Sequence, residues 1–478
     1  MVNRSGEPFD NASDLRIFVP PSRTATVAAT LCLIGTLGAG AVTTTSDGAS
    51  AAIAQPHAPD AAHARRPTPP VTVPGSLFGL GFDTCTAPTQ ATMDELLVAS
   101  PYWGVGVYIG GESRGCSQPQ LTREWVYTQH RTGWRIFPIW VGLQAPTLDR
   151  GTSHQVTCSS RPVHPMSGRP ANARRQGVAA ANRAIDHARG LGLKRGSTLF
   201  LDMEAYNYTI GRCNRAVLNF QSGWNRRLHS RGWKAGFYSS GASGIATLDA
   251  SRANDPGRYT MPDVLWLAWG NGKPDLEGEP YVRDSFWARQ RMHQYDLDRN
   301  RRFGRVTVHI DQNAILVGRG SPPGRRLHTC GVDLDFVRYR SYGRGARSPQ
   351  VAAAQCLLRR HGLYSRALSE RFDPATARAV GTYQNRRGMR VTRRLNAQTW
   401  TSLLSGGTRP LVKQGSASDQ VRFLQRALVA ALDQELVIDG YIATSTTQAI
   451  KRYQRAIGQR ATGVVTAATW QALNRGRH

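Results

Sequence analysis

Lysine and acidic residues are scarce in this sequence. Only five of the 61 basic residues are lysines, and the chain has 32 aspartates and glutamates, so its formal net charge is +29. Two explanations of the arginine excess stay open: the coding bias of a GC-rich genome, or attraction to a polyanion. Because the basic residues are spread along the chain and form no nucleic-acid-binding motif, we expect no nucleic-acid partner.

The sequence also lacks the spacings that mark a bound metal or nucleotide. No two cysteines have the C-x-x-C spacing of a zinc site, and His154, His293 and His309 show no metal-ligand spacing. We interpret these histidines as structural. No glycine fingerprint for a dinucleotide follows the first predicted strand. We therefore expect neither a metal nor a cofactor.

Long hydrophobic runs are rare, and only one suggests an export or membrane segment. Arginines precede the charge-free residues 25–42, and small residues follow at 49–54. This order is typical of a signal peptide cleaved after Ala54. Since Thr and Gly interrupt the apolar run, a permanent membrane span is the weaker alternative. We expect residues 1–54 to be removed, leaving a secreted, extracellular or cell-wall-associated monomer with no membrane contact.

From Ser76 onward, apolar runs rich in β-formers alternate with amphipathic segments. Strands are predicted at 77–83, 104–109, 134–141, 198–204, 234–239, 263–269, 290–295 and 306–311, with helices near 90–100, 120–132, 171–191, 213–231 and 241–250. Eight strands with crossovers in about 240 residues is the size of one parallel (β/α)8 TIM barrel, here 76–320. An open doubly wound sheet is the alternative.

An internal repeat follows the predicted barrel. Residues 55–75 and 321–344 are rich in Pro, Arg and other linker residues, and predict a flexible tether and a second linker. After them, seven landmarks recur at a constant offset of 70, which is a strong sign of duplication. They are Val351, Gln355, Thr376, Ala379, Tyr383-Gln384, Thr399-Trp400 and Leu403, matched by Val421, Gln425, Thr446, Ala449, Tyr453-Gln454, Thr469-Trp470 and Leu473. These positions predict two helical units at 345–407 and 415–478, joined by a linker at 408–414, with the matched residues in their cores.

Six cysteines remain after residue 54, and an even count in an exported protein predicts three disulfide bonds. Free buried thiols are the alternative. Two predicted pairs join loops that follow neighbouring strands, and the third joins the second linker to the first helix of the repeat. The expected pairs are Cys85 with Cys116, Cys158 with Cys213, and Cys330 with Cys356.

Four carboxylates close predicted strands of the barrel: Asp83, Asp202, Glu204 and Asp311. Since the carboxyl ends of parallel barrel strands share one mouth, we expect these side chains to face one pocket. Such a set is typical of a glycoside hydrolase. Taken singly, Asp83 and Asp311 could instead cap helices or form structural ion pairs.

The Asp202 and Glu204 side chains should point to the same face of their strand, roughly 6–7 Å apart. Two nearby carboxyls disfavour double ionisation, so one keeps a proton and can act as a general acid. We assign this role to Glu204, and we expect Asp202 to orient a substrate acetamido group or a water. Asp83 and Asp311 would shape the charge of the pocket. The alternative without function is that Asp202 and Glu204 lie at a solvated strand end.

Six motifs in order along the barrel carry a family resemblance. They are Gly81-Phe82-Asp83, Leu201-Asp202-Met203-Glu204, Phe237-Tyr238-Ser239, Leu265-Trp266-Leu267-Ala268-Trp269, His293-Gln294-Tyr295 and Ile310-Asp311-Gln312-Asn313. This region resembles an exported glycoside-hydrolase-like domain that is similar to the family 25 lysozymes, which are muramidases. The resemblance implies that Tyr238, Trp269 and Tyr295 contact the sugar. Residues 84–88 and 144–170 depart from the lysozyme pattern, so the sugar subsites can differ.

The repeats resemble the type 1 peptidoglycan-binding domains found beside cell-wall hydrolases. The first copy carries Val351 to Leu358, Phe372 to Thr376 and Thr399-Trp400, and the second keeps Leu424-Gln425 and Tyr453-Gln454 among other matches. The resemblance implies peptidoglycan, or a related cell-wall glycan, as the partner. Two functions therefore remain: a secreted muramidase-like hydrolase with two wall anchors, or a catalytically silent wall-binding or scaffolding protein. The sequence leaves retention or inversion of configuration open.

Overall fold

The computed structural model describes residues 68–149, 155–159, 164–321 and 329–478. The expected signal peptide at 1–54, most of the expected tether and His154 lie outside the described residues. Within the described ranges, no helix combines the length and the apolar character that a membrane span requires.

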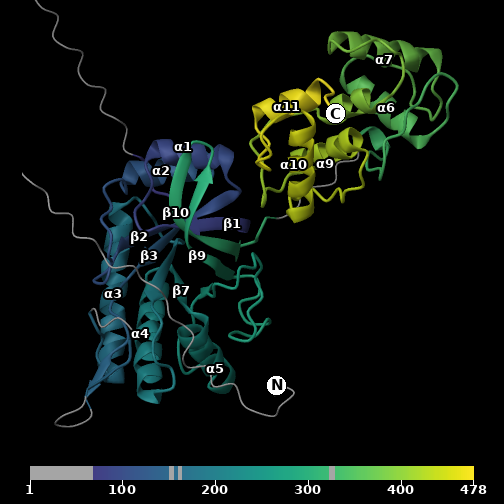
Figure 1. Cartoon of the computed structure of the whole chain (residues 1–478). Helices are drawn as coiled ribbons and strands as arrows, with labels where there is room; N and C mark the ends of the chain where they lie inside the picture. Colours follow the sequence, from purple (N-terminus) through teal and green to yellow (C-terminus); the bar gives the residue numbers. More distant parts are fainter. Residues whose placement is uncertain (1–67, 150–154, 160–163, 322–328) are drawn as a thin grey trace, which may run out of the picture. The chain divides into compact units, whose positions relative to one another are not determined.

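Eight strands close into a barrel in the order β1-β10-β9-β8-β7-β6-β3-β2 (Figure 1). The predicted fold class, a closed eight-stranded α/β barrel followed by helical domains, is confirmed. The strands are β1 (Leu77–Asp83), β2 (Tyr102–Gly110), β3 (Arg135–Trp140), β6 (Thr198–Met203), β7 (Lys234–Ser240), β8 (Val264–Ala268), β9 (Arg291–Phe303) and β10 (Val306–Val317).

The expectation that all eight strands are parallel is wrong for the last one. β10 pairs antiparallel with both β9 and β1, whereas the other neighbouring pairs are parallel. Only Gly304 and Arg305 separate β9 from β10, and two residues can join antiparallel strands but not parallel ones. Asp311 therefore lies within β10, opposite Asp83 of β1, and not at the end of a strand.

Helices cover the outside of the barrel where crossovers exist. They are α1 (Gln90–Ala99), α2 (Arg123–Thr132), α3 (Pro170–Gly190), α4 (Gly211–Ser230) and α5 (Ala246–Asn254), the last preceded by a π-helical turn, Gly241–Ile245. Threonine side chains cap α1 and α2, where Thr89 accepts from Thr92 N and Thr122 from Trp125 N. Residues 269–290, all of them described, link β8 to β9 without a helix.

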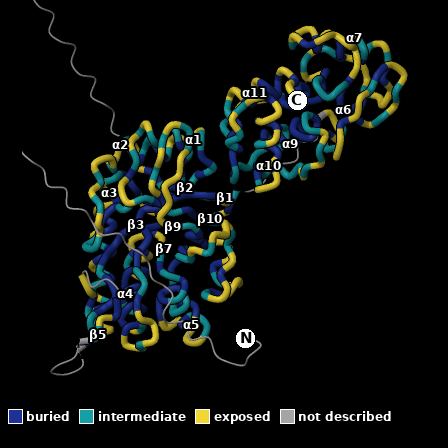
Figure 2. Tube along the Cα trace, in the orientation of Figure 1, coloured by how far each residue is buried: buried dark blue, intermediate teal, exposed yellow. Residues whose placement is uncertain are grey.

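Apolar side chains fill both the barrel and the layer between barrel and helices. Figure 2 shows the strands as mostly buried and the outer faces of the helices as exposed. Inside the barrel, Phe137, Phe200 and Trp266 pack together and are almost fully buried. Their rings fit because small residues face them, since a Cβ at Gly236 would collide with the Phe200 ring. The interior is therefore a packed core below the mouth.

Two units of three helices form the C-terminal part. They are α6 (Pro349–Arg360), α7 (Pro374–Arg386) and α8 (Ala397–Leu404), then α9 (Asp419–Leu432), α10 (Thr444–Ala456) and α11 (Ala467–Asn474). The matching helices begin 70 residues apart, as the repeat predicted. Trp400 and Trp470 are fully buried in one continuous apolar core, in agreement with the expected role of the repeated positions.

The folded domains include several residues that we expected to lie in linkers. Val73, expected in the tether, is 1% exposed in the barrel core. Leu334 and Tyr339, expected in the second linker, are buried in the core of the repeats, as is Val412 from the short linker. In each case an apolar side chain from an expected linker is buried in the core of a neighbouring domain. The composition of the linker does not predict this burial.

The three expected disulfide bonds are present. Cys85 is bonded to Cys116, Cys158 to Cys213 and Cys330 to Cys356. The second bond connects α4 to the segment that contains the short hairpin β4 (Thr147–Asp149) and β5 (Gln155–Thr157).

Candidate active site

Asp83 and Asp311 share one hydrogen-bonding partner at the mouth of the barrel. The Gln294 amide nitrogen donates to Asp83 Oδ1 and Oδ2 at 3.2 and 3.1 Å and to Asp311 Oδ2 at 3.1 Å. Asn313 Nδ2 also donates to Asp83 Oδ1 at 2.6 Å. Two carboxylates from β1 and β10 are thus held together by amides from β9 and β10, so the structure brings these two predicted site residues together.

A chain of aromatic side chains supports these amides. Trp266 Nε1 donates to Asn313 Oδ1 at 2.7 Å, and the Tyr238 hydroxyl donates to Gln294 Oε1 at 2.9 Å. The Tyr238 and Trp266 rings pack edge to face, with centroids 5.5 Å apart. Each amide therefore has its oxygen occupied and its nitrogen directed at a carboxylate, which fixes the orientation of Gln294 and Asn313.

Asp202 and Glu204 lie at the carboxyl end of β6 and are held by a residue that the sequence reasoning missed. Gln144, in the segment after β3, accepts from the backbone N–H of Glu204 at 2.9 Å and donates to the Asp202 carbonyl oxygen at 3.1 Å. Gln144 is 2% exposed, so these bonds are shielded from water. Asp202 is buried and its Oδ1 has no partner, whereas Glu204 is half-buried.

Burial raises the pKa of Asp83, Asp202 and Asp311. For Asp202 the desolvation effect is largest, followed by repulsion from Glu204 and Asp83. For Asp83, desolvation and repulsion from Asp311 exceed the opposing hydrogen bonds of Asn313 and Gln294, so its pKa is also raised. Desolvation likewise raises the pKa of Asp311, against the backbone N–H of Asp298, which donates to it at 2.5 Å. The site therefore retains protons that a solvated carboxylate cluster would lose.

The four carboxyls Asp83, Asp202, Glu204 and Asp311 form a carboxylate cluster together with a side chain that the sequence reasoning missed. This side chain is Tyr108 of β2. Burial raises its pKa most, and repulsion from all four carboxylates adds to this effect. Gly106, two residues earlier, faces the interior, because a Cβ there would collide with Asp83 and Trp266. Alternate residues of a strand share a face, so Tyr108 also points inward. The alternation of Gly104, Gly106 and Tyr108 with apolar neighbours was the available signal.

The structure does not bring all three expected sugar contacts together. Tyr238 belongs to the cluster, but Tyr295 is 8% exposed on the opposite face of β9, in the layer under the helices. Its neighbour Gln294 faces the carboxylates, so strand alternation turns Tyr295 away, and the expected sugar contact does not fit this placement. Trp269 is half-buried and packs on His293, whose nitrogens contact the carbonyl oxygens of Asp275 and Trp269.

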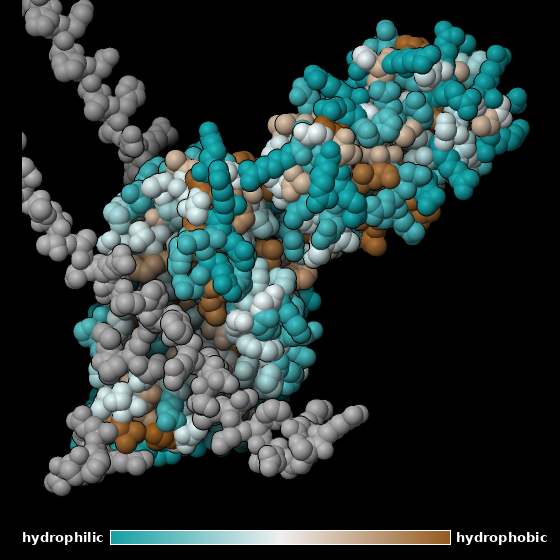
Figure 3. All heavy atoms as spheres, in the orientation of Figure 1, coloured by the Kyte–Doolittle hydropathy of each residue, from teal (hydrophilic) through white to brown (hydrophobic). Residues whose placement is uncertain are grey.

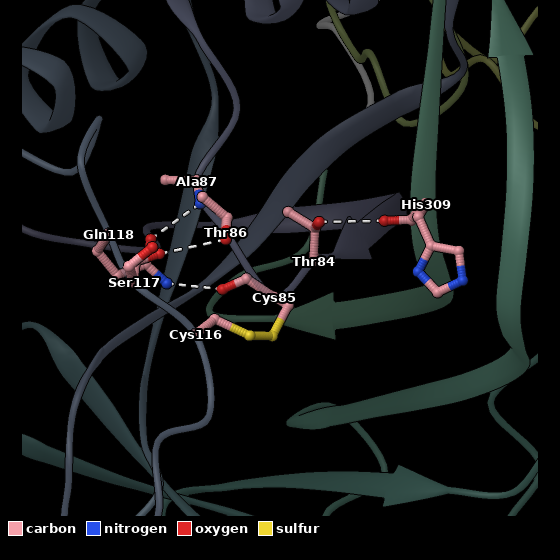
Figure 4. The surroundings of a disulfide bond; sticks show 8 residues. All are labelled: Thr84, Cys85, Thr86, Ala87, Cys116, Ser117, Gln118 and His309. Carbon is pink, nitrogen blue, oxygen red and sulfur yellow. Dashed lines mark hydrogen bonds between the residues drawn. A yellow bond between two sulfur atoms is a disulfide. The ribbon is translucent and has the colours of Figure 1, made fainter. Parts of the chain in front are cut away.

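A disulfide bond fixes the loop that follows Asp83 (Figure 4). The bond joins Cys85 to Cys116, and Gln118 ties the same two loops by accepting from Ala87 N at 2.9 Å and donating to the Cys85 carbonyl oxygen at 2.6 Å. On the other side, Thr84 donates to the His309 carbonyl oxygen of β10 at 3.1 Å. Within the described residues, no group of three or more His, Cys, Asp or Glu side chains could hold a metal ion.

Comparison with known families agrees with this geometry. Residues 95–315 match the Rv2525c-like, glycoside hydrolase-like domain, and residues 347–403 and 417–473 each match the putative peptidoglycan binding domain. These matches define a cell-wall-active protein. Its chain carries an Rv2525c-like glycoside hydrolase-like domain followed by two peptidoglycan-binding domains. The first match contains Asp202, Glu204 and Asp311, while Asp83 precedes it.

The solved structures that match part of this chain have low sequence identities and low TM-scores to it. An uncharacterized B. stearothermophilus protein is 17% identical over 50% of this chain and 96% of its own, with a TM-score of 0.31. The catalytic domain of endolysin ply40 from bacteriophage P40 of Listeria monocytogenes is 15% identical over 50% and 93%, with a TM-score of 0.30. The modular autolysin LytC from Streptococcus pneumoniae is 11% identical over 49% and 46%, with a TM-score of 0.28. No curated protein matches this chain.

Proposed function

We propose that the barrel is a muramidase-like glycoside hydrolase that cleaves the glycan strands of peptidoglycan. The observation that carries this proposal is that all four carboxylates act on the buried Tyr108 hydroxyl inside one barrel, with Asp202 near the end of β6 and Glu204 just after that strand. Glu204 is the more exposed of the pair and can reach a glycosidic oxygen, so it serves as the general acid.

Asp202 acts beside the anomeric carbon in this proposal. Its raised pKa and its unpartnered Oδ1 suit a group that donates to or orients the substrate acetamido group, or a water. Asp83 and Asp311 shape the charge of the pocket around the oxocarbenium-like centre that forms as the glycosidic bond breaks. Tyr238 and Tyr108 border this position with hydroxyl groups.

Secretion and wall anchoring complete the proposal. The three disulfide bonds suit an oxidising, extracellular location, and the two C-terminal domains match peptidoglycan-binding domains. The chain would then be exported, remain at the cell wall as a monomer, and present the barrel to its polymeric substrate.

The test is release of reducing sugar ends from purified peptidoglycan by the wild type and by Glu204→Gln. We expect the variant to lose at least about 100-fold in kcat, because general acid catalysis contributes factors of this size, with little change in melting temperature. Glu124→Gln is the matched control, since Glu124 is exposed on α2. Full activity of Glu204→Gln would refute the assignment. If the wild type binds peptidoglycan but never cleaves it, the protein is a catalytically silent wall-binding protein.

A further inference from the structure

The two repeats have diverged strongly in charge. Residues 347–403 contain eleven arginines and two carboxylates, for a net charge of +9, whereas residues 417–473 contain six basic and four acidic residues, for a net charge of +2. The surface over α6 and α7 is mostly hydrophilic (Figure 3). Since both copies share one helical pattern, the fold does not require this excess of charge.

Four cationic or ionisable residues gather where α6 and α7 end. Arg360 and Arg386 are the last residues of these helices and are exposed, and His361 and Arg387 follow them. The His361 ring lies 5.0 Å from the Tyr383 ring, and the Arg387 guanidinium lies 5.3 Å from the same ring. We call these four residues and Tyr383 the arginine cluster.

Among the described residues, no carboxylate is one of the groups that shift the pKa of His361 in the arginine cluster. Burial lowers the pKa of His361 most, and the charges of Arg387, Arg360 and Arg386 lower it further. The Arg360 guanidinium lies over the Phe423 ring at 5.5 Å, a contact that orients it without neutralising its charge.

The second repeat shows that the cluster is not a structural necessity. At the offset of 70, the four ionisable residues are replaced by aliphatic ones, while the tyrosine is kept as Tyr453. The replacements are Ala430, Ala431, Ala456 and Ile457. Stabilisation of a helix dipole could explain arginines at a helix end. However, α9, the counterpart of α6, has no basic residue in its last turn and is nevertheless formed, whereas α10, the counterpart of α7, keeps Arg455 there.

We propose that the arginine cluster binds phosphate groups of a phosphodiester-linked cell-wall polymer. Guanidinium groups donate paired hydrogen bonds to phosphate oxygens, and each phosphodiester of such a polymer carries a full negative charge. Because three arginines act on the His361 imidazole, an anion bound beside it would offset the repulsion among these positive charges. This inference rests on the proposed function for the location of the protein at the cell wall. It assigns a phosphate ligand to the first repeat and not to the second.

The first test measures the His361 pKa by NMR in the full-length chain with ¹³C-labelled histidine, assigned with His361→Gln. Poly(glycerol phosphate) is the probe. We expect the pKa of His361 to rise when the polymer binds, because the bound anion offsets the surrounding positive charge. The double variant Arg360→Ala with Arg386→Ala should bind the polymer about tenfold or more weakly, since charge-assisted hydrogen bonds are lost.

The control removes the same charge at the opposite end of α6. Arg344 and Arg347 are exposed before α6 begins, about 18 Å along the helix from Arg360. Arg344→Ala with Arg347→Ala should leave the affinity within about twofold at 0.15 M salt, where distant exposed charges are screened. Equal losses in the two double variants, or an unchanged pKa of His361 at saturating polymer, would overturn the proposal.

The second test identifies the source of the anion. Full-length Glu204→Gln is sedimented with cell walls before and after hydrofluoric acid removes their phosphodiester-linked polymers, so that hydrolysis does not interfere. We expect Arg360→Ala with Arg386→Ala to weaken binding to intact walls only. If the same variant loses binding to stripped peptidoglycan, the ligand is a carboxylate of the stem peptides and the phosphate assignment is wrong. Neither result depends on whether the barrel cleaves glycan, so this inference and the proposed hydrolase activity fail separately.

Discussion

At the scale of single residues, the four carboxylates Asp83, Asp202, Glu204 and Asp311 include ionisable groups whose charged form is disfavoured by burial. Asp83 and Asp202 are each 3% exposed, yet both are ionisable. Asp83 has Gln294 and Asn313 as donors, whereas Asp202 Oδ1 has no partner. Burial without a full set of hydrogen bonds disfavours the charged form, so ionisation of Asp202 at neutral pH costs folding free energy.

Asp202→Asn should therefore stabilise the protein at neutral pH while it abolishes activity. The folded state binds the Asp202 proton more tightly than the unfolded chain, so the wild-type free energy of unfolding falls as pH rises above the ordinary carboxyl pKa. A gain of about 1 kcal/mol would raise Tm by about 2–4 °C at pH 7. Calorimetry at pH 4 and pH 7 checks this, because the gain should shrink at pH 4. The opposite result would be a variant that loses stability relative to the wild type at pH 7 but not at pH 4. That result would show that Asp202 is ionised and well solvated in the wild type.

Gln144 is a positioning residue, and its removal should affect Glu204 indirectly. Gln144→Ala leaves the Glu204 backbone N–H without its partner, at a cost of about 1–3 kcal/mol. We expect kcat to fall while KM changes little, because Gln144 holds the β6 end and not the substrate. Steady-state kinetics on soluble glycan fragments separates the two constants. A rise in KM at constant kcat would instead place Gln144 in a sugar subsite.

At the scale of elements, loops and bulges shape the barrel mouth. The pairing of β10 with β9 shifts register around Asp311, and such irregularities can re-aim a side chain. The Cys85–Cys116 bond and Gln118 tie the loops after β1 and β2 beside this position. Asp83 and Asp311 thus lie beside a hairpin, a register shift and a crosslinked loop pair.

Replacing Cys85 and Cys116 by serine should lower both stability and activity. The bond closes a loop over a sequence separation of 31 residues, and its loss should cost about 2–4 kcal/mol. The freed loops should also reduce kcat, because they flank Asp83. Thermal unfolding and glycan hydrolysis are measured together. The double variant Cys330→Ser with Cys356→Ser is the control and should leave kcat on soluble fragments unchanged, since this bond lies among the repeats.

At the scale of the whole molecule, the repeats form a folded unit that begins earlier than the repeat pattern indicates. The Tyr339 ring packs on Trp400 with centroids 5.2 Å apart, and Trp400 Nε1 donates to the Arg340 carbonyl oxygen at 2.9 Å. The Cys330–Cys356 bond attaches the same segment to α6. Residues 329–344 therefore belong to the folded repeats and not to a free linker.

A fragment of residues 329–478 should fold and bind insoluble peptidoglycan, whereas a fragment of residues 345–478 should be less stable. The shorter fragment loses Leu334, Tyr339 and the disulfide bond, which together should lower its free energy of unfolding by several kcal/mol, about 2–4 of which comes from the bond. Circular dichroism melting and sedimentation with peptidoglycan test both statements. Equal melting temperatures would show that residues 329–344 are only attached to the surface.

The features that rest on local pattern could be predicted from the sequence. Alternating apolar runs marked all eight strands, and a constant offset marked the repeats. Neighbouring loops predicted two of the disulfide pairs, and the position of Cys330 just before the first repeat predicted the third. The direction of β10 depended on a two-residue turn at Gly304 and Arg305 that the strand pattern does not register. The inward position of Tyr108, the outward position of Tyr295 and the amides that hold Asp83 became visible only in the closed barrel, because strand pairing sets which side chains meet across more than 200 residues.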